Sequence, residues 1–284
     1  MFERMERSWT LVKASASILM KDQSLLVFPL ISGIAVVMVM ATFILPLGGF
    51  DALHQLSGDD GKPMSAAQYA IVFAFYLCQY FVIFFFNTAL VGAVMLRLDG
   101  KDSTVGDGLR IAASKLYPIL GYAFIAATVG MLLRALQERV GFIGQIVVGL
   151  VGMGWTLATY LVVPVLAARD VGPYEAVVES AQLFKKTWGE SVIGQAGLGL
   201  AFGLIYLGVA ICGLILVFMA VAMHSVPLIV MTGIVAVGAL LLTSLVHAAL
   251  AGIYAAALYR YATDSHGPDG FDPKALEKAF APAG

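Results

Sequence analysis

Long stretches without Asp, Glu, Lys or Arg dominate the pattern of apolar and polar positions along this chain. A transmembrane helix needs about 20 apolar residues, because it crosses a hydrocarbon core of about 30 Å at about 1.5 Å per residue. The 69 uncharged residues between Glu190 and Arg260 are enough for two crossings, joined by a turn just before Pro227. Four further uncharged stretches hold one crossing each. The pattern predicts six spans, at residues 25–47, 69–96, 116–136, 143–167, 192–222 and 227–259.

A short segment with helical periodicity precedes each pair of spans. In each segment the apolar residues recur at steps of three and four, and the charged residues lie off that stripe. The three stripes are Phe2, Met5, Trp9, Val12, Ala16 and Leu19; Val105, Leu109, Ala112 and Leu116; and Tyr174, Val177, Ala181, Phe184 and Trp188. A helix with one apolar and one charged face is typical of the headgroup region of a bilayer. We therefore expect Trp9, Phe184 and Trp188 at the membrane interface.

The predicted fold is all-α: a polytopic bundle of about six transmembrane helices, arranged as three hairpins that each follow an interfacial amphipathic helix. Residues 1–22 form the first interfacial helix, residues 23–260 the six-span domain, and residues 261–284 a tail with a short helix after Asp272. The three units enter the membrane in the same direction, as parallel repeats do. Internal duplication and the common appearance of any chain of hairpins both explain this pattern.

Composition and charge support a membrane protein and orient it. Hydrophobic residues make up 60% of the chain and charged residues only 12%, whereas a soluble domain carries about 25% charged residues. The segments on the side of the N-terminus hold 14 of the 17 Lys and Arg residues, and Lys62, Arg134 and Arg139 lie on the other side. Because basic loops stay in the cytoplasm, both termini and the interfacial helices are predicted to be cytoplasmic, in the inner membrane of the cell.

Polar residues inside the predicted spans are the candidates for function. None of the spans has a charged residue at its centre, which disfavours a proton-coupled transporter. The remaining candidates are Gln79, Asn87, Gln195, Thr243 and His247. Thr243 and His247 share one helix face and would line a polar cavity if they act in function. The alternative, which we favour, is a hydrogen bond to a neighbouring helix, worth about 1 kcal/mol or less.

Sequence patterns of common enzymes are missing. The chain has no GxSxG nucleophile elbow, no HExxH metal helix, no phosphate-binding P-loop and no CxxC pair. Cys78 and Cys212 lie inside apolar runs, where a thiol behaves as a small apolar side chain. We therefore expect no enzymatic activity, no cofactor and no bound metal.

Two resemblances bear on the architecture. The first is carried by Arg7, Ser8, Trp9, Ser15 to Leu19, Asp22, Leu26, Phe28, Pro29 and Ser32. These residues resemble the opening of a bacterial and archaeal family of six-span proteins known only as a domain of unknown function. The later units, such as Glu175 to Trp188 leading into Gly194, resemble more loosely the membrane domain of some glycerophosphodiester phosphodiesterases. Both resemblances imply an architecture and no activity, since this sequence has no soluble phosphodiesterase domain.

The function expected from these patterns is that of a non-enzymatic membrane component that interacts with lipid or protein through its interfacial helices. The alternative is a channel or transporter for a lipid-like or small solute, through a cavity near Asn87, Gln195 and His247. Membrane lipids are the expected partners, and a second copy of the chain or another membrane protein is left open. The net charge of −1 predicts no nucleic-acid partner.

Overall fold

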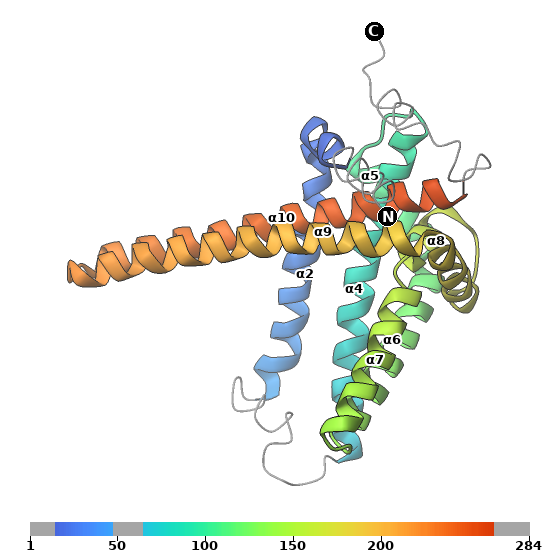
Figure 1. Ribbon diagram of the computed structural model, residues 1–284, viewed down its shortest axis with the longest axis horizontal. Helices are drawn as coiled ribbons and strands as arrows, with labels where there is room; N and C mark the ends of the chain where they lie inside the picture. The colour runs from blue at the N-terminus through green and yellow to red at the C-terminus, as the bar shows by residue number, and fades with distance from the viewer. Residues whose placement is uncertain (1–14, 48–64, 264–284) are drawn as a thin grey trace. The chain divides into compact units, whose positions relative to one another are not determined.

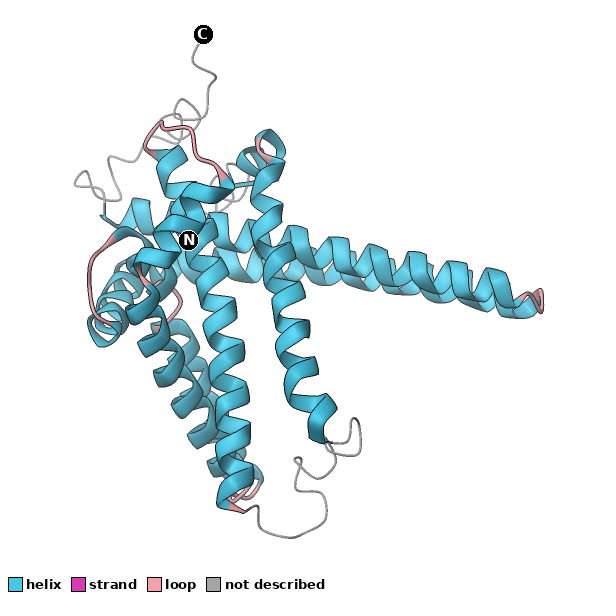
Figure 2. Cartoon of the chain, turned by 180° about the vertical axis from the view of Figure 1, so that it is seen from behind, coloured by secondary structure: helices cyan, strands magenta, loops and turns pink. Residues whose placement is uncertain are grey.

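The computed structural model describes residues 15–47 and 65–263, and these residues are helical except for short connections, without a strand (Figure 2). A helical segment at 15–21 comes first. The elements that follow are η1 (Gln23–Leu26), α2 (Val27–Ile44), η2 (Leu45–Leu47), α4 (Ala66–Leu98), α5 (Val105–Ser114), α6 (Leu116–Gln137), α7 (Phe142–Ala158), α8 (Val162–Ala168), α9 (Pro173–Ala222) and α10 (Val226–Thr263). Most of the first predicted interfacial helix, including Trp9, and the predicted tail helix lie outside the described residues.

The prediction of an all-α membrane protein with six spans is confirmed. Within the described ranges, six helices are long and apolar enough to cross a membrane: Gln23–Ile44, Ala66–Leu98, Leu116–Gln137, Phe142–Ala168, Gln195–Ala222 and Val226–Thr263. Many large apolar side chains on them are exposed, such as Leu214 at 71% and Leu242 at 65%. Water does not tolerate such continuous apolar surface, so lipid is the natural solvent for these helices.

The chain divides into two compact units, Val27–Lys186 and Met1–Leu26 together with Thr187–Gly284. We call them the four-span unit and the two-span unit and describe each by itself. The second boundary falls inside α9, where Thr187 leaves helical geometry with φ −115° and ψ 19°. The helix Pro173–Lys186, which we call the surface helix, therefore belongs to the four-span unit.

In the four-span unit, α4 is the central helix. It packs against α2, α5, α6 and α8, and α6 packs in turn against α7 (Figure 1). The buried core is concentrated at the end where α5 lies, which we call the basic end because Arg97, Lys115 and Arg169 border it. Residues 88–95 of α4 are buried there, together with Ile119 of α6 and Leu166 of α8. The opposite halves of the spans are more exposed.

Helix α5 is the second predicted amphipathic segment, and it is seated directly on α4. A Cβ built on Gly108 would lie 2.5 Å from the carbonyl oxygen of Ala89 and 2.7 Å from Cζ of Phe28. A Cβ on Gly92 would lie 2.9 Å from Cγ2 of Ile111. The backbones of α4 and α5 therefore touch. The rest of the protein covers part of the face that the sequence pattern assigned to the membrane interface.

The two-span unit is built around a long hairpin of α10 and the part of α9 that follows Thr187. The turn predicted before Pro227 is present, and His224 takes a positive φ of 52° there. The two helices approach closely at Gly213, where a Cβ would lie 2.8 Å from Cβ of Ala236. At the far end of α10, residues 253–259 are buried, and η1 packs against this helix.

Candidate functional site

The surface helix has three different faces. Its buried stripe consists of Ala176, Ser180 and Leu183, which recur at steps of four and three. The predicted apolar stripe lies about 100° further round, at the usual rotation of a 3.6-residue helix. On that side Tyr174 is 70% exposed and Phe184 is half-buried. The apolar stripe read from the sequence is therefore not the one that the protein itself buries.

Charged groups occupy the third face of the surface helix and the connections beside it. Lys186 is exposed near its end, and the exposed Lys185 lies on the same side as Tyr174, at the edge of the apolar stripe. Glu179 accepts a hydrogen bond of 2.7 Å from Nη1 of Arg169 in the connection after α8. Next to this pair, Nζ of Lys115 donates to Oδ1 of Asp170 at 2.9 Å and to the carbonyl oxygen of Arg169 at 3.0 Å. These bonds tie the start of α6 to the connection that leads into the surface helix.

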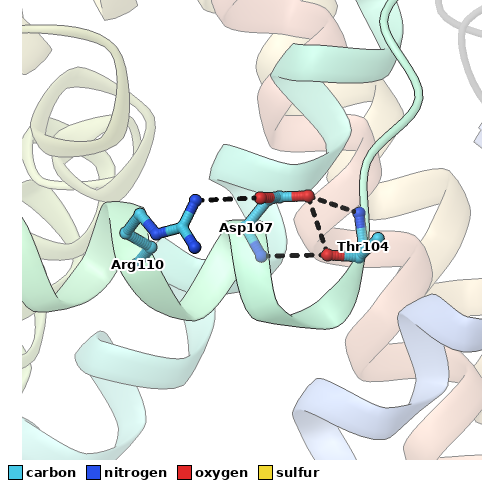
Figure 3. A network of polar contacts seen from close by, with 3 residues as sticks. All are labelled: Thr104, Asp107 and Arg110. Carbon is cyan, nitrogen blue, oxygen red and sulfur yellow. Dashed lines mark hydrogen bonds and ion pairs between the residues drawn. The ribbon is translucent and has the colours of Figure 1, made fainter.

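A capping box fixes the start of α5 at the basic end (Figure 3). The backbone N–H of Asp107 donates to Oγ1 of Thr104 at 3.2 Å, and this hydroxyl donates to the Asp107 carboxylate at 2.7 Å. The backbone N–H of Thr104 also donates to the carboxylate, at 3.0 Å, and Nη1 of Arg110 lies 3.4 Å from it. The two bonds from Thr104 lower the pKa of Asp107 below its ordinary value, and Arg110 acts in the same direction.

The fourth span is broken, although the sequence pattern predicted it as a single stretch. Helix α7 ends at Ala158 and α8 begins at Val162. The cause is Pro164, which has no N–H to donate to the carbonyl of Tyr160 and whose ring clashes with that carbonyl in a continuous helix. Ser180 of the surface helix bonds across the gap, accepting from the N–H of Leu161 at 3.0 Å and donating to the carbonyl of Ala158 at 2.7 Å.

Of the predicted intramembrane polar residues, Gln79 and Asn87 lie on α4 in the four-span unit. Nε2 of Gln79 donates to the carbonyl of Val36 in α2 at 3.4 Å, while its Oε1 is buried without a partner in the described chain. Asn87 is half-buried, and no hydrogen bond joins its amide to another described residue. Gln79 is thus a helix contact, whereas the amide of Asn87 keeps its bonding capacity.

Gln195, Thr243 and His247 belong to the two-span unit. The hydroxyl of Thr243 donates to the carbonyl of Ala239 in its own helix at 2.8 Å. The ring of His247 stacks on Phe202 of α9, with centroids 4.4 Å apart and an angle of 12° between the planes. Nε2 of Gln195 is buried without a partner among the described residues. That Asn87, Gln195 and His247 converge on one cavity stays a prediction, because they belong to different units.

Two tyrosines of α4 that face α6 were not predicted from the sequence. Tyr76 accepts a hydrogen bond of 3.2 Å from Arg134, and its ring stacks on Tyr80 at 6.2 Å. The hydroxyl of Tyr80 lies 3.5 Å from the position of a Cβ on Gly130, so the glycine leaves room for it against α6. Their spacing of four residues on a helix was the available signal. This signal is hidden in a pattern that treats tyrosine as one more apolar residue.

The comparisons with known proteins give a family and no activity. No curated protein and no solved structure matches the chain. The looser resemblance to the membrane domain of glycerophosphodiester phosphodiesterases receives no support. A family described as a family of unknown function, DUF6159, matches residues 66–271, which include five of the six spans. The chain belongs to this family, DUF6159.

Proposed function

We propose that this chain is a non-enzymatic, multi-pass component of the inner membrane that holds lipid headgroups of the cytoplasmic leaflet with its surface helix. The observation that carries the proposal is the exposed apolar side of the surface helix, where Tyr174 of the predicted stripe is 70% exposed and the neighbouring Val178 is 38% exposed. Lys185 and Lys186 extend beside it. An apolar stripe flanked by lysines suits the boundary between acyl chains and anionic headgroups.

Apolar burial and charge should contribute comparably to lipid binding. Full burial of a large apolar side chain is worth about 1.5–3 kcal/mol, and the partly exposed Tyr174 and Val178 would gain a fraction of this each. A lysine near an anionic leaflet contributes about 1 kcal/mol. Lipid binding by the surface helix should therefore depend on both the apolar stripe and the fraction of anionic lipid.

The test is hydrogen–deuterium exchange of the full chain in nanodiscs of phosphatidylcholine, with and without phosphatidylglycerol. Anionic lipid should slow exchange in residues 174–186. The double variant Tyr174→Ser, Val178→Ser should speed exchange in the same residues several-fold. The matched control is Gln182→Ser, an exposed position on the charged side of the same helix. Equal exchange in the stripe variant, the control and the unaltered chain would remove lipid binding by this helix.

The proposed orientation has its own test. We expect the basic end in the cytoplasm because basic loops are retained there, and six spans would bring both termini to that side. Reporter tags fused to each end should therefore report the same compartment. Opposite compartments would refute the topology, whatever the lipid-binding result.

A second candidate function, transport of a lipid-like or small solute, is favoured by the polar groups of α4 that have no partner. Asn87 and the hydroxyl of Tyr80 form no hydrogen bond with other described residues, and polar groups inside a bilayer are expensive unless they serve a purpose. A passage lined by the amide of Asn87 should lose most of its flux in Asn87→Leu. If the reconstituted protein moves neither ions nor labelled lipids, transport is ruled out and lipid binding is left as the proposed function.

A further inference from the structure

Two backbone groups at the break in the fourth span bond to the surface helix. Helix α7 stops at Ala158, and α8 starts at Val162, with Pro164 in its first turn. Helix α7 has 17 residues and is therefore about 25 Å long, slightly less than the hydrocarbon thickness of about 30 Å. The break thus falls near the boundary of the membrane on the side of the basic end. Backbone groups exposed to hydrocarbon are not tolerated, so the N–H of Leu161 and the carbonyl of Ala158 must be bonded.

A single hydroxyl satisfies both groups. Ser180 and Leu161 are 0% exposed, so water does not compete at this point. Oγ of Ser180 accepts from Leu161 at 3.0 Å and donates to Ala158 at 2.7 Å, which uses the donor and one acceptor site of the hydroxyl. Hydrogen bonds of this kind weaken steeply when the distance grows beyond about 3.5 Å. A shift of the surface helix by about 1 Å would therefore release both backbone groups.

Ser180 lies on the same rigid helix as the exposed apolar stripe. Residues 173–186 form an uninterrupted helix that ends at the non-helical Thr187. Its start is fixed, because a Cβ on Gly121 of α6 would lie 2.7 Å from Cγ of Pro173. Leu183 near its other end is 6% exposed, so the helix is packed against the protein along its length. Because the helix is rigid, a displacement of Tyr174 or Val178 on its exposed side also displaces the hydroxyl of Ser180 on its buried side.

We propose that Ser180 couples the binding of the surface helix to lipid with the break in the fourth span. When the helix lies on lipid, Ser180 bonds both backbone groups at the break, and when the helix is lifted these bonds are lost. The involvement of lipid rests on the proposed function. The coupling itself rests only on the hydrogen bonds of Ser180. Allosteric coupling is reciprocal. Loosening the break must therefore also loosen the surface helix.

Hydrogen–deuterium exchange in nanodiscs tests the coupling, with one peptide covering residues 158–163 and another covering 174–186. In nanodiscs without anionic lipid, Ser180→Ala should raise exchange at least tenfold in the first peptide. It should also raise exchange in the second peptide. Thr156→Ala is the matched control, since this hydroxyl in the same span bonds only the carbonyl of Gly152 in its own helix. Pro164→Ala, which restores the missing N–H, should lower exchange in the first peptide and make it insensitive to lipid.

The outcomes separate the coupling from the lipid proposal. Faster exchange at 158–163 in Ser180→Ala without any change at 174–186 would overturn the coupling, whether or not lipid binds. If anionic lipid slows exchange at 174–186 and leaves 158–163 unchanged in the unaltered chain, the surface helix binds lipid but the coupling is wrong. If lipid affects neither peptide while Ser180→Ala affects both, the coupling holds and the lipid proposal fails.

Discussion

Gly108 of α5 and Ala89 of α4 lie so close that a Cβ on the glycine would approach the alanine carbonyl oxygen to 2.5 Å. No side chain fits between these backbones, and Phe28 of α2 closes the same space from another side, at 2.7 Å. The position of α5 on the four-span unit therefore depends on a missing side chain. This contact holds together three helices at the end of the unit where its core lies.

We expect Gly108→Val to lift α5 from α4. Forcing extra carbon atoms into a packed core costs about 1–3 kcal/mol, so the thermal midpoint in detergent micelles should fall clearly. The control is Gly106→Ala in the same helix, where the nearest atom to a new Cβ is Oγ1 of Thr104 at 3.6 Å. That change should be neutral or stabilising, because alanine favours helix over glycine by up to about 1 kcal/mol. Equal loss in both variants would show that the close approach is not what matters.

The start of α5 should weaken in acid. The pKa of Asp107 is lowered from its ordinary value of 3.8, chiefly by the hydroxyl and the N–H of Thr104. A carboxyl whose pKa is lower in the folded state stabilises that state above pH 3.8 and loses this contribution as the pH falls through its folded value. The unaltered chain should therefore lose stability below about pH 4 more steeply than Asp107→Asn. Identical curves of thermal midpoint against pH for the two proteins would contradict this.

Some of this architecture follows directly from the sequence. The length of uncharged stretches determines the number of spans, because lipid solvates apolar side chains and excludes charged ones. The periodicity of residues 105–116 likewise predicted α5. The packing of α5 on α4 was not predictable in the same way, since Gly108 and Gly92 have no side chain and contribute nothing to a pattern of apolar positions.

The surface helix also shows that a pattern of apolar positions does not identify the face that packs on the protein. Its apolar stripe was read correctly as a helix face, but the face that packs on the protein contains Ala176 and Ser180, which are small or polar and fall off the stripe. The break in the fourth span was missed because Pro164 lies inside an uncharged stretch, and counting charges does not detect a lost backbone donor. Partners that bond through one hydroxyl leave no periodic signal.

The two partners of the ion pair between Lys115 and Asp170 should contribute very differently to stability. The side chain of Asp170 is 99% exposed and that of Lys115 only 15%. An exposed pair contributes between 0 and about 1 kcal/mol, so Asp170→Asn should hardly change the thermal midpoint. Lys115→Met should lower it more, because the ammonium group also donates to the carbonyl of Arg169 at 3.0 Å. Comparable losses in the two variants would mean that the ion pair itself is what matters.

His247 distinguishes a structural role from a functional one. Its ring lies parallel to Phe202 at 4.4 Å and edge-on to Tyr206 at 6.0 Å, within the α9–α10 hairpin. Aromatic pairs of this kind are worth about 0.5–1.5 kcal/mol beyond the buried area. If the ring only packs, His247→Phe should keep the thermal midpoint and His247→Ala should lower it. If the imidazole nitrogens serve a solute or a reaction, His247→Phe should abolish that activity in reconstituted vesicles while the hairpin stays folded. The phenylalanine variant therefore decides between the two roles, because it preserves the stacked ring and removes only the nitrogens.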